Sequence, residues 1–432
     1  MSRPLTSPDE EPYSKAYLWY VVGLLALVNA VNLMDRLVFS VMMPAIKAEL
    51  QLSDTQLGLL SGFAFAALYA TLGIPIAAYA DRSVRRNIVG AALIIWSAMT
   101  ALCGLAQNLL HLTLARVGVG IGEAGCLPPS HSMITDFIPA EWRSRALGII
   151  TAGGSLGSIA GLIVGGWLVA ALGWRGTFLA MGVPGVLLGV IVFLTLREPA
   201  RTRNPAPAPA GREGDPATII ELIRARPVYL QLVLAIATSS FFGYGMQQWL
   251  PSFYMRSYGL TIAQVGLLFG LVSGTASILG TIAGGYVGDR LYRRGVGAVL
   301  LYGIACTVLT ALLKLATVVS TTQAASLAFN FGGSLFSSAF LGPAFALVQI
   351  LVPPGLRARA VAVLTFFVSL LGTGAGPLFV GVLSDVYASA GVGKEALRTA
   401  LTWCCLLGIW PIVHLWLARK ALGSATYRNA LA

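Results

Sequence analysis

Long apolar runs separated by short polar segments make up most of this 432-residue chain. Each run approaches the roughly 20 residues that an α-helix needs to cross a bilayer. The pattern therefore predicts an all-α integral membrane protein with twelve transmembrane helices. We place the spans at 18–43, 56–80, 88–109, 112–136, 146–172, 177–196, 228–253, 264–288, 297–319, 323–350, 359–385 and 399–418.

One segment without an apolar run divides the predicted spans into two groups of six. It contains Asn204-Pro-Ala-Pro-Ala-Pro-Ala-Gly, a proline-rich sequence typical of a semi-rigid or disordered linker. The expected organisation is a tail, a six-helix bundle, a linker, a second six-helix bundle and a second tail. Their boundaries fall at 1–17, 18–196, 197–227, 228–418 and 419–432.

The two groups of spans repeat each other in sequence. The segment 52–62 matches 260–270 at a constant offset of 208, and Ser53/Gln56 and Thr261/Gln264 both have capping-box spacing. Both matched segments are therefore expected to begin a helix. At the same offset, Asp81-Arg82 with Arg85-Arg86 matches Asp289-Arg290 with Arg293-Arg294, and at an offset of 214 Arg143-Ser-Arg145-Ala matches Arg357-Ala-Arg359-Ala.

Composition and charge support the membrane prediction and orient it. The chain is 56% hydrophobic and 11% charged, which excludes an ordinary soluble domain. If both termini are cytoplasmic, 21 of the 29 lysines and arginines lie on the inner side and 5 on the outer side. The positive-inside rule thus predicts cytoplasmic termini, in a plasma membrane or, for a bacterium, the inner membrane.

A net charge of +12 could also suggest a nucleic-acid partner, but the basic residues are scattered over short loops and form no continuous patch. We therefore expect no nucleic acid to bind. The cysteines lie in apolar runs without zinc-ligand spacing, so we predict no metal and no cofactor; they are Cys103, Cys126, Cys306, Cys404 and Cys405. The first apolar run has no cleavage site, which indicates a retained helix.

Motifs in the loops and in three spans resemble a known family over nearly the whole chain. Asp-Arg-x-x-Arg-Arg after the second and eighth spans resembles the loop signature of the major facilitator superfamily. Within it, Asn32-Leu-Met-Asp35-Arg36, Ile95-Trp96-Ser97-Ala98-Met99-Thr100 and Arg116-x3-Gly120-Ile-Gly122-Glu123-Ala124 are similar to spinster-type transporters. The resemblance implies alternating access, proton coupling, and a lysophospholipid or sphingoid-phosphate substrate.

Four charged residues lie in the interior of the first and fourth predicted spans, where a central charge costs about 2.5 to 3.5 kcal/mol. Arg116 and Glu123 are two helical turns apart and share one face of the fourth span, and Asp35 and Arg36 adjoin in the first. Burial favours a neutral carboxyl and a neighbouring guanidinium favours a charged one, so the two effects compete. We predict that Asp35 and Glu123 carry the coupling proton while Arg36 and Arg116 bind an anionic head group. The alternative is a static salt-bridge network.

The second half lacks these charges at the matching positions. Asn330 and Ser337 correspond to Arg116 and Glu123. The seventh span offers aromatic and amide side chains instead, which predicts an apolar wall for the substrate's tail; they are Phe242, Tyr244, Gln247 and Trp249. The alternative is that the aromatic rings merely pack against neighbouring helices. Lys314, near the outer end of the ninth span, is expected to snorkel to the interface.

Charged residues at the cytoplasmic span ends are candidates for gating. A carboxylate there can cap a helix of the facing half and favour the state closed on the inside. The predicted gating residues are Asp81, Arg82, Arg85, Arg145, Asp289, Arg290 and Arg359. The alternative is an ordinary solvated helix end.

Together these features predict a monomeric secondary transporter that uses protons and moves an anionic amphiphile, in contact with membrane lipids. A proton-coupled carrier of a soluble organic anion or a drug-like molecule is the alternative. A membrane enzyme would need a nucleophile–base pair or a metal set, and the sequence shows neither.

Overall fold

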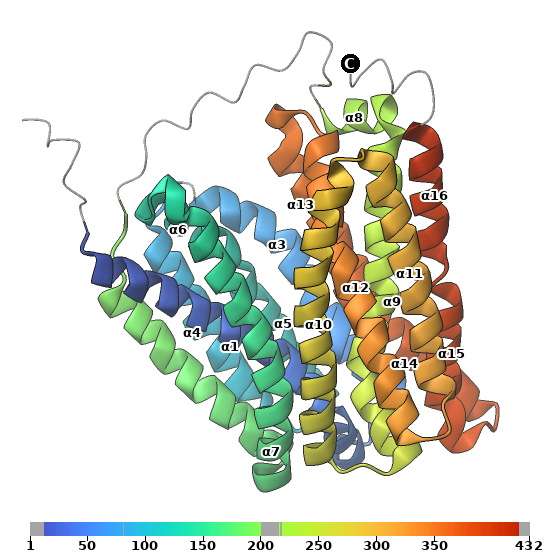
Figure 1. The fold of residues 1–432 in the computed structure, drawn as a ribbon. Coiled ribbons are helices and arrows are strands. Elements are labelled where there is room, and N and C mark those ends of the chain that lie inside the picture. Colours follow the sequence, from blue (N-terminus) through green and yellow to red (C-terminus); the bar gives the residue numbers. More distant parts are fainter. Residues whose placement is uncertain (1–12, 81, 200–215, 217, 423–432) are drawn as a thin grey trace, which may run out of the picture.

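A computed structural model describes residues 13–80, 82–199, 216 and 218–422 of the chain. Over these residues the protein is built from helices (Figure 1). Ten helical segments are long and apolar enough to cross a membrane. One of them, Glu141–Thr195, has 55 residues and reverses at Gly173 (φ 68°), so it provides two spans. With α5 and α6, which together form one further span, the predicted number of twelve spans is confirmed.

The N-terminal bundle contains the first six spans. Its helices are α1 (Lys15–Leu50), α2 (Asp54–Gly58), the π-helical turn η1 (Leu59–Phe63), α3 (Ala64–Ala80), α4 (Arg85–Cys103), α5 (Leu109–Ala124), α6 (Leu127–Phe137) and α7 (Ala140–Thr195). α1 and α4 both pack along α7.

The C-terminal bundle repeats this plan after the short helix α8 (Ile219–Ala225). It consists of α9 (Pro227–Tyr258), α10 (Ile262–Tyr292), α11 (Val296–Val319), α12 (Gln323–Leu351), α13 (Arg357–Phe367), the π-helical η3 (Val368–Ala375), α14 (Gly376–Ser389), α15 (Ala396–Leu407) and α16 (Trp410–Leu422). α10 and α11 pack on α12, and α16 packs on α9. We call the side of the molecule that carries α8 the α8 side, and the opposite side the distal side.

The two bundles meet where α2 packs on α14 and α10 packs on α7. Both α2 and α10 begin with a true capping box, as their sequences predict: Ser53 with Gln56, and Thr261 with Gln264. One turn further on, a Cβ at Gly58 would lie 2.6 Å from the carbonyl oxygen of Pro377, and one at Gly266 only 3.0 Å from Cα of Gly166. The repeated glycines thus let the halves approach closely on the distal side.

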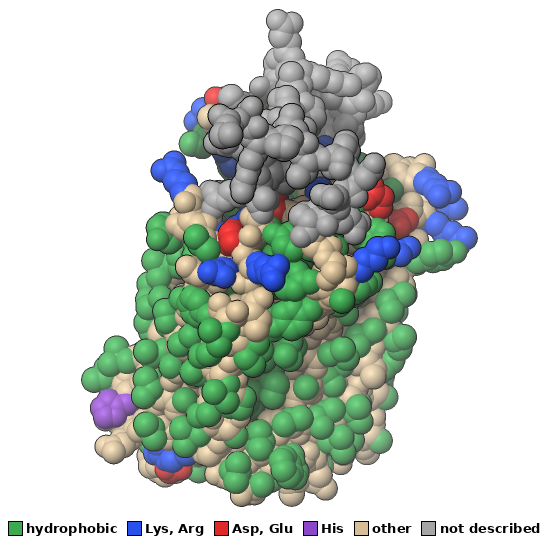
Figure 2. Space-filling model, turned by 90° about the vertical axis from the view of Figure 1, so that its left-hand side faces the viewer, with side chains coloured by type: hydrophobic (Ala, Val, Ile, Leu, Met, Phe, Trp, Pro, Cys, Tyr) green, Lys and Arg blue, Asp and Glu red, His purple; other side chains and the backbone are tan. Residues whose placement is uncertain are grey.

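The outer surface matches a bilayer. Figure 2 shows one face of the molecule covered by hydrophobic side chains, with Lys and Arg gathered along the edge nearest the grey residues. Large apolar side chains of α7 are exposed on this outer surface, including Trp167 (63%) and Leu194 (78%). In water such a belt would be costly, whereas in lipid it replaces one apolar environment by another.

Candidate functional site

A buried ion pair joins the first and fourth spans. Arg36 of α1 donates from Nε to Oε2 of Glu123 of α5, with 2.7 Å between the two atoms. The Glu123 side chain is completely buried, while 20% of the Arg36 side chain remains exposed. The rings of Phe65 and Tyr69 lie 4.8 and 4.6 Å from the guanidinium carbon, so aromatic faces complete the surroundings of this cation.

Glu123 therefore pairs with a residue of another helix, and its expected partner Arg116 is engaged elsewhere. Arg116 donates from Nε to the carbonyl oxygen of Leu60, at 3.4 Å, within the π-helical turn η1. Its guanidinium carbon lies 4.6 Å from the ring centre of Phe39. Only 2% of Arg116 is exposed, so this cation stabilises packing between α5, α1 and η1.

Asp35 lies beside this pair and is also buried, with 2% exposed. Thr100 of α4 donates to its Oδ2 at 3.4 Å, whereas Oδ1 makes no hydrogen bond of good geometry with any described residue. Glu123 Oε1 is likewise without such a bond among the described residues. Each carboxyl thus has one oxygen without a well-aligned hydrogen bond from a described residue, and such an oxygen can accept a proton.

The structure divides the aromatic and amide residues predicted to line the apolar wall into two groups. Trp249 is completely buried and donates from Nε1 to the carbonyl oxygen of Pro377 at 2.8 Å, and Phe242 (8% exposed) packs in the same core. In this structure both side chains pack in the core, and their predicted place on a substrate-facing wall stays a prediction. Tyr244 is 38% exposed and Gln247 is partly exposed, so these two side chains are accessible.

Lys314 also differs from the prediction. Its amine turns into the C-terminal bundle, where Nζ lies 2.6 Å from Asn330 Oδ1 and 2.9 Å from Ser334 Oγ. Asn330 in turn donates to Ser273 of α10 at 2.9 Å. Because hydrogen-bond acceptors on α12 hold the amine inside the bundle, the lysine does not snorkel.

The residues predicted to gate the α8 side are not engaged with the opposite bundle. Arg82, Arg145, Asp289, Arg290 and Arg359 are exposed, and none of them forms an ion pair with another residue that the structure describes. Asp81 lies outside the described residues.

Arg85 is an exception, because it is buried and bonded within its own bundle. It contacts Asp136 at 2.5 Å and Glu198 at 2.8 Å. Arg85 thereby ties α4 to α6 and to the chain after α7, which is a different place from the predicted gate between the halves.

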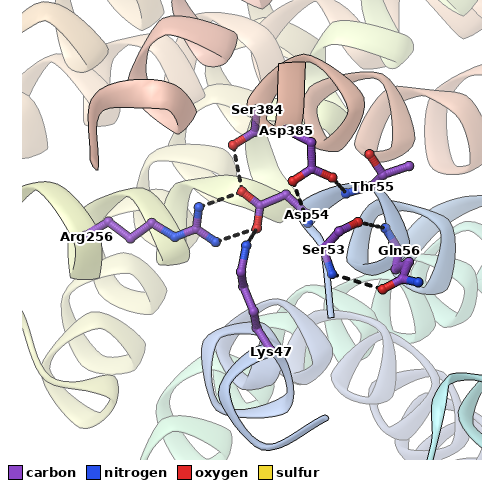
Figure 3. Close-up of polar contacts among 8 residues, drawn as sticks. All are labelled: Lys47, Ser53, Asp54, Thr55, Gln56, Arg256, Ser384 and Asp385. Carbon is purple, nitrogen blue, oxygen red and sulfur yellow. Dashed lines mark hydrogen bonds and ion pairs between the residues drawn. The ribbon is translucent and has the colours of Figure 1, made fainter. Parts of the chain in front are cut away.

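The distal side carries the ion pair that joins the two halves within the described chain (Figure 3). Arg256 at the end of α9 donates from Nη1 and Nη2 to the two carboxylate oxygens of Asp54, both at 2.7 Å. Lys47 of α1 also donates to Asp54, as does Ser384 of α14 at 2.6 Å. With 4% of its side chain exposed, Asp54 is enclosed by three helices.

A second carboxylate completes this cluster, which we call the distal latch: Lys47, Asp54, Arg256, Ser384 and Asp385. Asp385 accepts from the backbone N–H groups of Asp54 and Thr55 at 3.0 and 2.7 Å and so caps α2 from the opposite bundle. The sequence reading missed this latch. The available signal was a charged residue at the start of an apolar helix, where the repeat has Ile262.

A twelve-helix protein with two repeated bundles, a buried acid–base pair and a closed side is the architecture of a secondary transporter. Comparison with known proteins agrees. The model of the Major Facilitator Superfamily matches residues 25–377, and the chain belongs to this superfamily.

Two curated relatives of this chain are themselves transport proteins. An MFS-type efflux pump of Mycolicibacterium smegmatis is 37% identical over 414 residues, covering 95% of this chain and 94% of the relative. The cis,cis-muconate transport protein of Acinetobacter baylyi is 28% identical, covering 65% and 68%.

Among solved structures, a bacterial homolog of the human lysosomal transporter Spinster, in an inward-facing and unoccupied conformation, superposes with a TM-score of 0.83. It is 29% identical, and the match covers 95% of this chain and 98% of that one. The chain is thus a spinster-type major facilitator transporter, and its relatives are transporters and not enzymes.

Proposed function

We propose that this transporter couples the movement of an anionic amphiphile to protons, with Glu123 as the proton carrier. The observation that supports this most directly is the Arg36–Glu123 pair, in which the acid is fully buried while the arginine is partly exposed. An anion arriving at Arg36 would have to compete with Glu123 for the same guanidinium. A proton on Glu123 removes that competition.

The coupling follows from the charges. Guanidinium stays charged at any physiological pH, so a proton transferred to a Glu123 oxygen leaves Arg36 as a cation without a carboxylate partner. The anionic group of the substrate then takes the place of Glu123 on Arg36. Since protonation of Glu123 raises the affinity for the anion, binding of the anion must raise the proton affinity of Glu123 by the same factor. Proton and anion would therefore cross together, with Asp35 as a second buried carboxyl able to exchange protons.

Two features support an amphiphile with an anionic head. Arg36 is bordered by the rings of Phe65 and Tyr69, and on the C-terminal bundle Tyr244 and Gln247 remain accessible. We propose a lysophospholipid or a sphingoid-phosphate-like lipid as the substrate, because a guanidinium group can bind its phosphate through two parallel hydrogen bonds. A compact organic anion is the second candidate, favoured by the similarity to the cis,cis-muconate transport protein.

Alternating access would use two sets of contacts between the bundles in turn, one on the distal side and one on the α8 side. In the described state the distal latch closes one side, while the gating candidates of the α8 side are exposed. We propose that Arg82, Arg145, Asp289, Arg290 and Arg359, together with Asp81, engage when the molecule closes on the α8 side. The positive-inside bias favours a cytoplasmic α8 side and cytoplasmic termini.

Flux into proteoliposomes tests the proposal. Labelled lysophosphatidic acid is offered with and without an imposed pH gradient, next to a short-chain phosphate monoester and next to muconate. We expect lysolipid flux that rises with the gradient, and flux in Glu123→Gln that no longer responds to it. Full gradient dependence in Glu123→Gln would refute the proton assignment, and transport of muconate alone would establish the second candidate.

A further inference from the structure

A groove opens between the beginnings of α1 and α7, at the surface of the N-terminal bundle. It has a volume of about 270 Å³. Its floor is apolar and buried, formed by Val22, Ile138 and Ala146, which are 2%, 5% and 4% exposed. The groove lies outside the Arg36–Glu123 site and outside the distal latch, and it shares one residue, Arg145, with the gating candidates of the α8 side.

Aromatic side chains form one part of the rim. Trp19 and Trp142 lie with their ring centres 5.9 Å apart, and they remain 48% and 42% exposed. Tryptophan is enriched where the hydrocarbon region of a bilayer meets the head groups, because its ring is apolar and its N–H is polar. Two exposed tryptophans at the first helical turns of α1 and α7 therefore suit the depth of lipid head groups.

Cations form the other part of the rim. Lys15 and Arg145 line the groove, both are exposed, and neither has an ion-pair partner among the described residues. Glu141 is the acidic residue of the lining, so the rim carries a net charge of +1. A groove with an apolar floor, an aromatic edge and a positive rim complements a molecule with an anionic head and an apolar tail.

We propose that this groove binds the head group and upper chain of an anionic membrane phospholipid, whose phosphate contacts Lys15 and Arg145. Pockets that enclose a whole drug-sized ligand measure about 300–1,000 Å³, so a volume below that range suits part of a lipid. The remaining acyl chain continues along the exposed apolar surface of α1 and α7. This lipid is a resident ligand, distinct from the transported molecule.

Native mass spectrometry of the purified full-length protein in detergent tests this site. Phosphatidylglycerol is titrated against the wild type, the double variant Lys15→Gln/Arg145→Gln, and the charge-matched control Arg293→Gln/Arg294→Gln on the C-terminal bundle. We expect one tight adduct on the wild type and on the control. Binding to the double variant should weaken at least tenfold, since each basic residue near a lipid surface contributes about a fivefold factor.

Three outcomes would overturn the proposal. The double variant could bind phosphatidylglycerol as the wild type does. Phosphatidylethanolamine could bind as tightly as phosphatidylglycerol, which would show that the rim does not select an anionic head group. Neutralising Asp9, Glu10 and Glu11 could itself raise phosphatidylglycerol binding tenfold, which would make the acidic N-terminal segment the occupant. Glu123→Gln should keep the adduct, which separates this site from the transport site.

Discussion

The two bundles share one helical plan but treat buried charge in opposite ways. In the N-terminal bundle Arg36 is paired with Glu123, and we propose that both groups exchange partners when a proton or an anion arrives. In the C-terminal bundle the cation is Lys314, held by the neutral groups of Asn330 and Ser334. Its acidic residues, Asp289, Asp385 and Glu395, stand at helix ends. Both copies of the duplicated fold thus provide the same helical arrangement, whereas the coupling that we propose depends on a charge pair that one copy possesses.

The largest expected effect comes from Arg36→Gln. Arg36 is the proposed anchor of the substrate's anionic group, and truncating one partner of a buried charge pair at a binding site costs about 2–5 kcal/mol of affinity. We therefore expect lysolipid flux to fall by roughly a hundredfold or more, at about 1.4 kcal/mol per factor of ten.

Arg175→Gln is the matched control for that variant. It also removes a guanidinium paired with a glutamate, Glu49, but there the side chains are 35% and 50% exposed. Exposed pairs contribute about 0–1 kcal/mol, so flux should stay within a few-fold of the wild type. Equal losses in the two variants would remove the special status of the buried pair.

Trp249 and Tyr244 separate packing from binding within the C-terminal bundle. Trp249→Ala should lower the free energy of unfolding by about 3–5 kcal/mol, since a fully buried indole leaves a cavity. Tyr244→Ala should leave the thermal midpoint nearly unchanged and raise KM for lysolipid. Thermal unfolding and initial-rate kinetics on both purified variants check this. A stable Trp249→Ala protein with a raised KM would instead indicate that Trp249 contacts the substrate.

Asp54→Asn tests the distal latch. The substitution removes the charge that Arg256 and Lys47 share, and both cations are partly exposed, so we expect a cost of about 1–2 kcal/mol. That changes the ratio of distal-open to distal-closed molecules about tenfold.

Spin labels at Gln51 and Val392, on the distal ends of the two bundles, would report this shift as a longer distance. Glu49→Gln, near the same end of α1, is the control and should leave the distance distribution unchanged. An unaltered distribution in Asp54→Asn would mean that glycine packing between the halves closes the distal side without the latch.

The smallest effect is expected for Lys314→Met. Lys314 is partly buried and has no acidic partner among the described residues. Substitution by an apolar side chain of similar length removes its hydrogen bonds to Asn330 and Ser334, but it also removes the cost of desolvating the amine. Stability should therefore change by less than about 1 kcal/mol. The response of flux to a pH gradient should be preserved. Loss of that response in proteoliposomes would show that the C-terminal bundle also takes part in coupling.

The sequence predicted much of the fold, because length and hydropathy alone specify helices that must satisfy their own backbone in lipid. The capping boxes at Ser53 and Thr261 were also legible, since Ser or Thr followed by Gln at the third position is a local signal.

The ion-pair partners of the buried carboxylates could not be predicted from the sequence. Arg116 and Glu123 share a helix face, yet the nearest carboxylate–guanidinium geometry joins Glu123 to Arg36 across two helices. Asp54 and Arg256 are likewise far apart in sequence and meet through the packing of the halves. Helical periodicity places residues on a face, whereas the choice among partners depends on the relative rotation and depth of neighbouring helices.

The most direct test of the account is the number of protons taken up when the anion binds. Purified protein in weakly buffered detergent is mixed with lysophosphatidic acid, and a pH indicator records the proton change. We predict uptake of about one proton per bound anion in the wild type, and none in Glu123→Gln, because linkage ties the two events to this carboxyl. Binding by the wild type without proton uptake, or equal uptake by Glu123→Gln, would contradict the proposal that a proton on Glu123 frees Arg36.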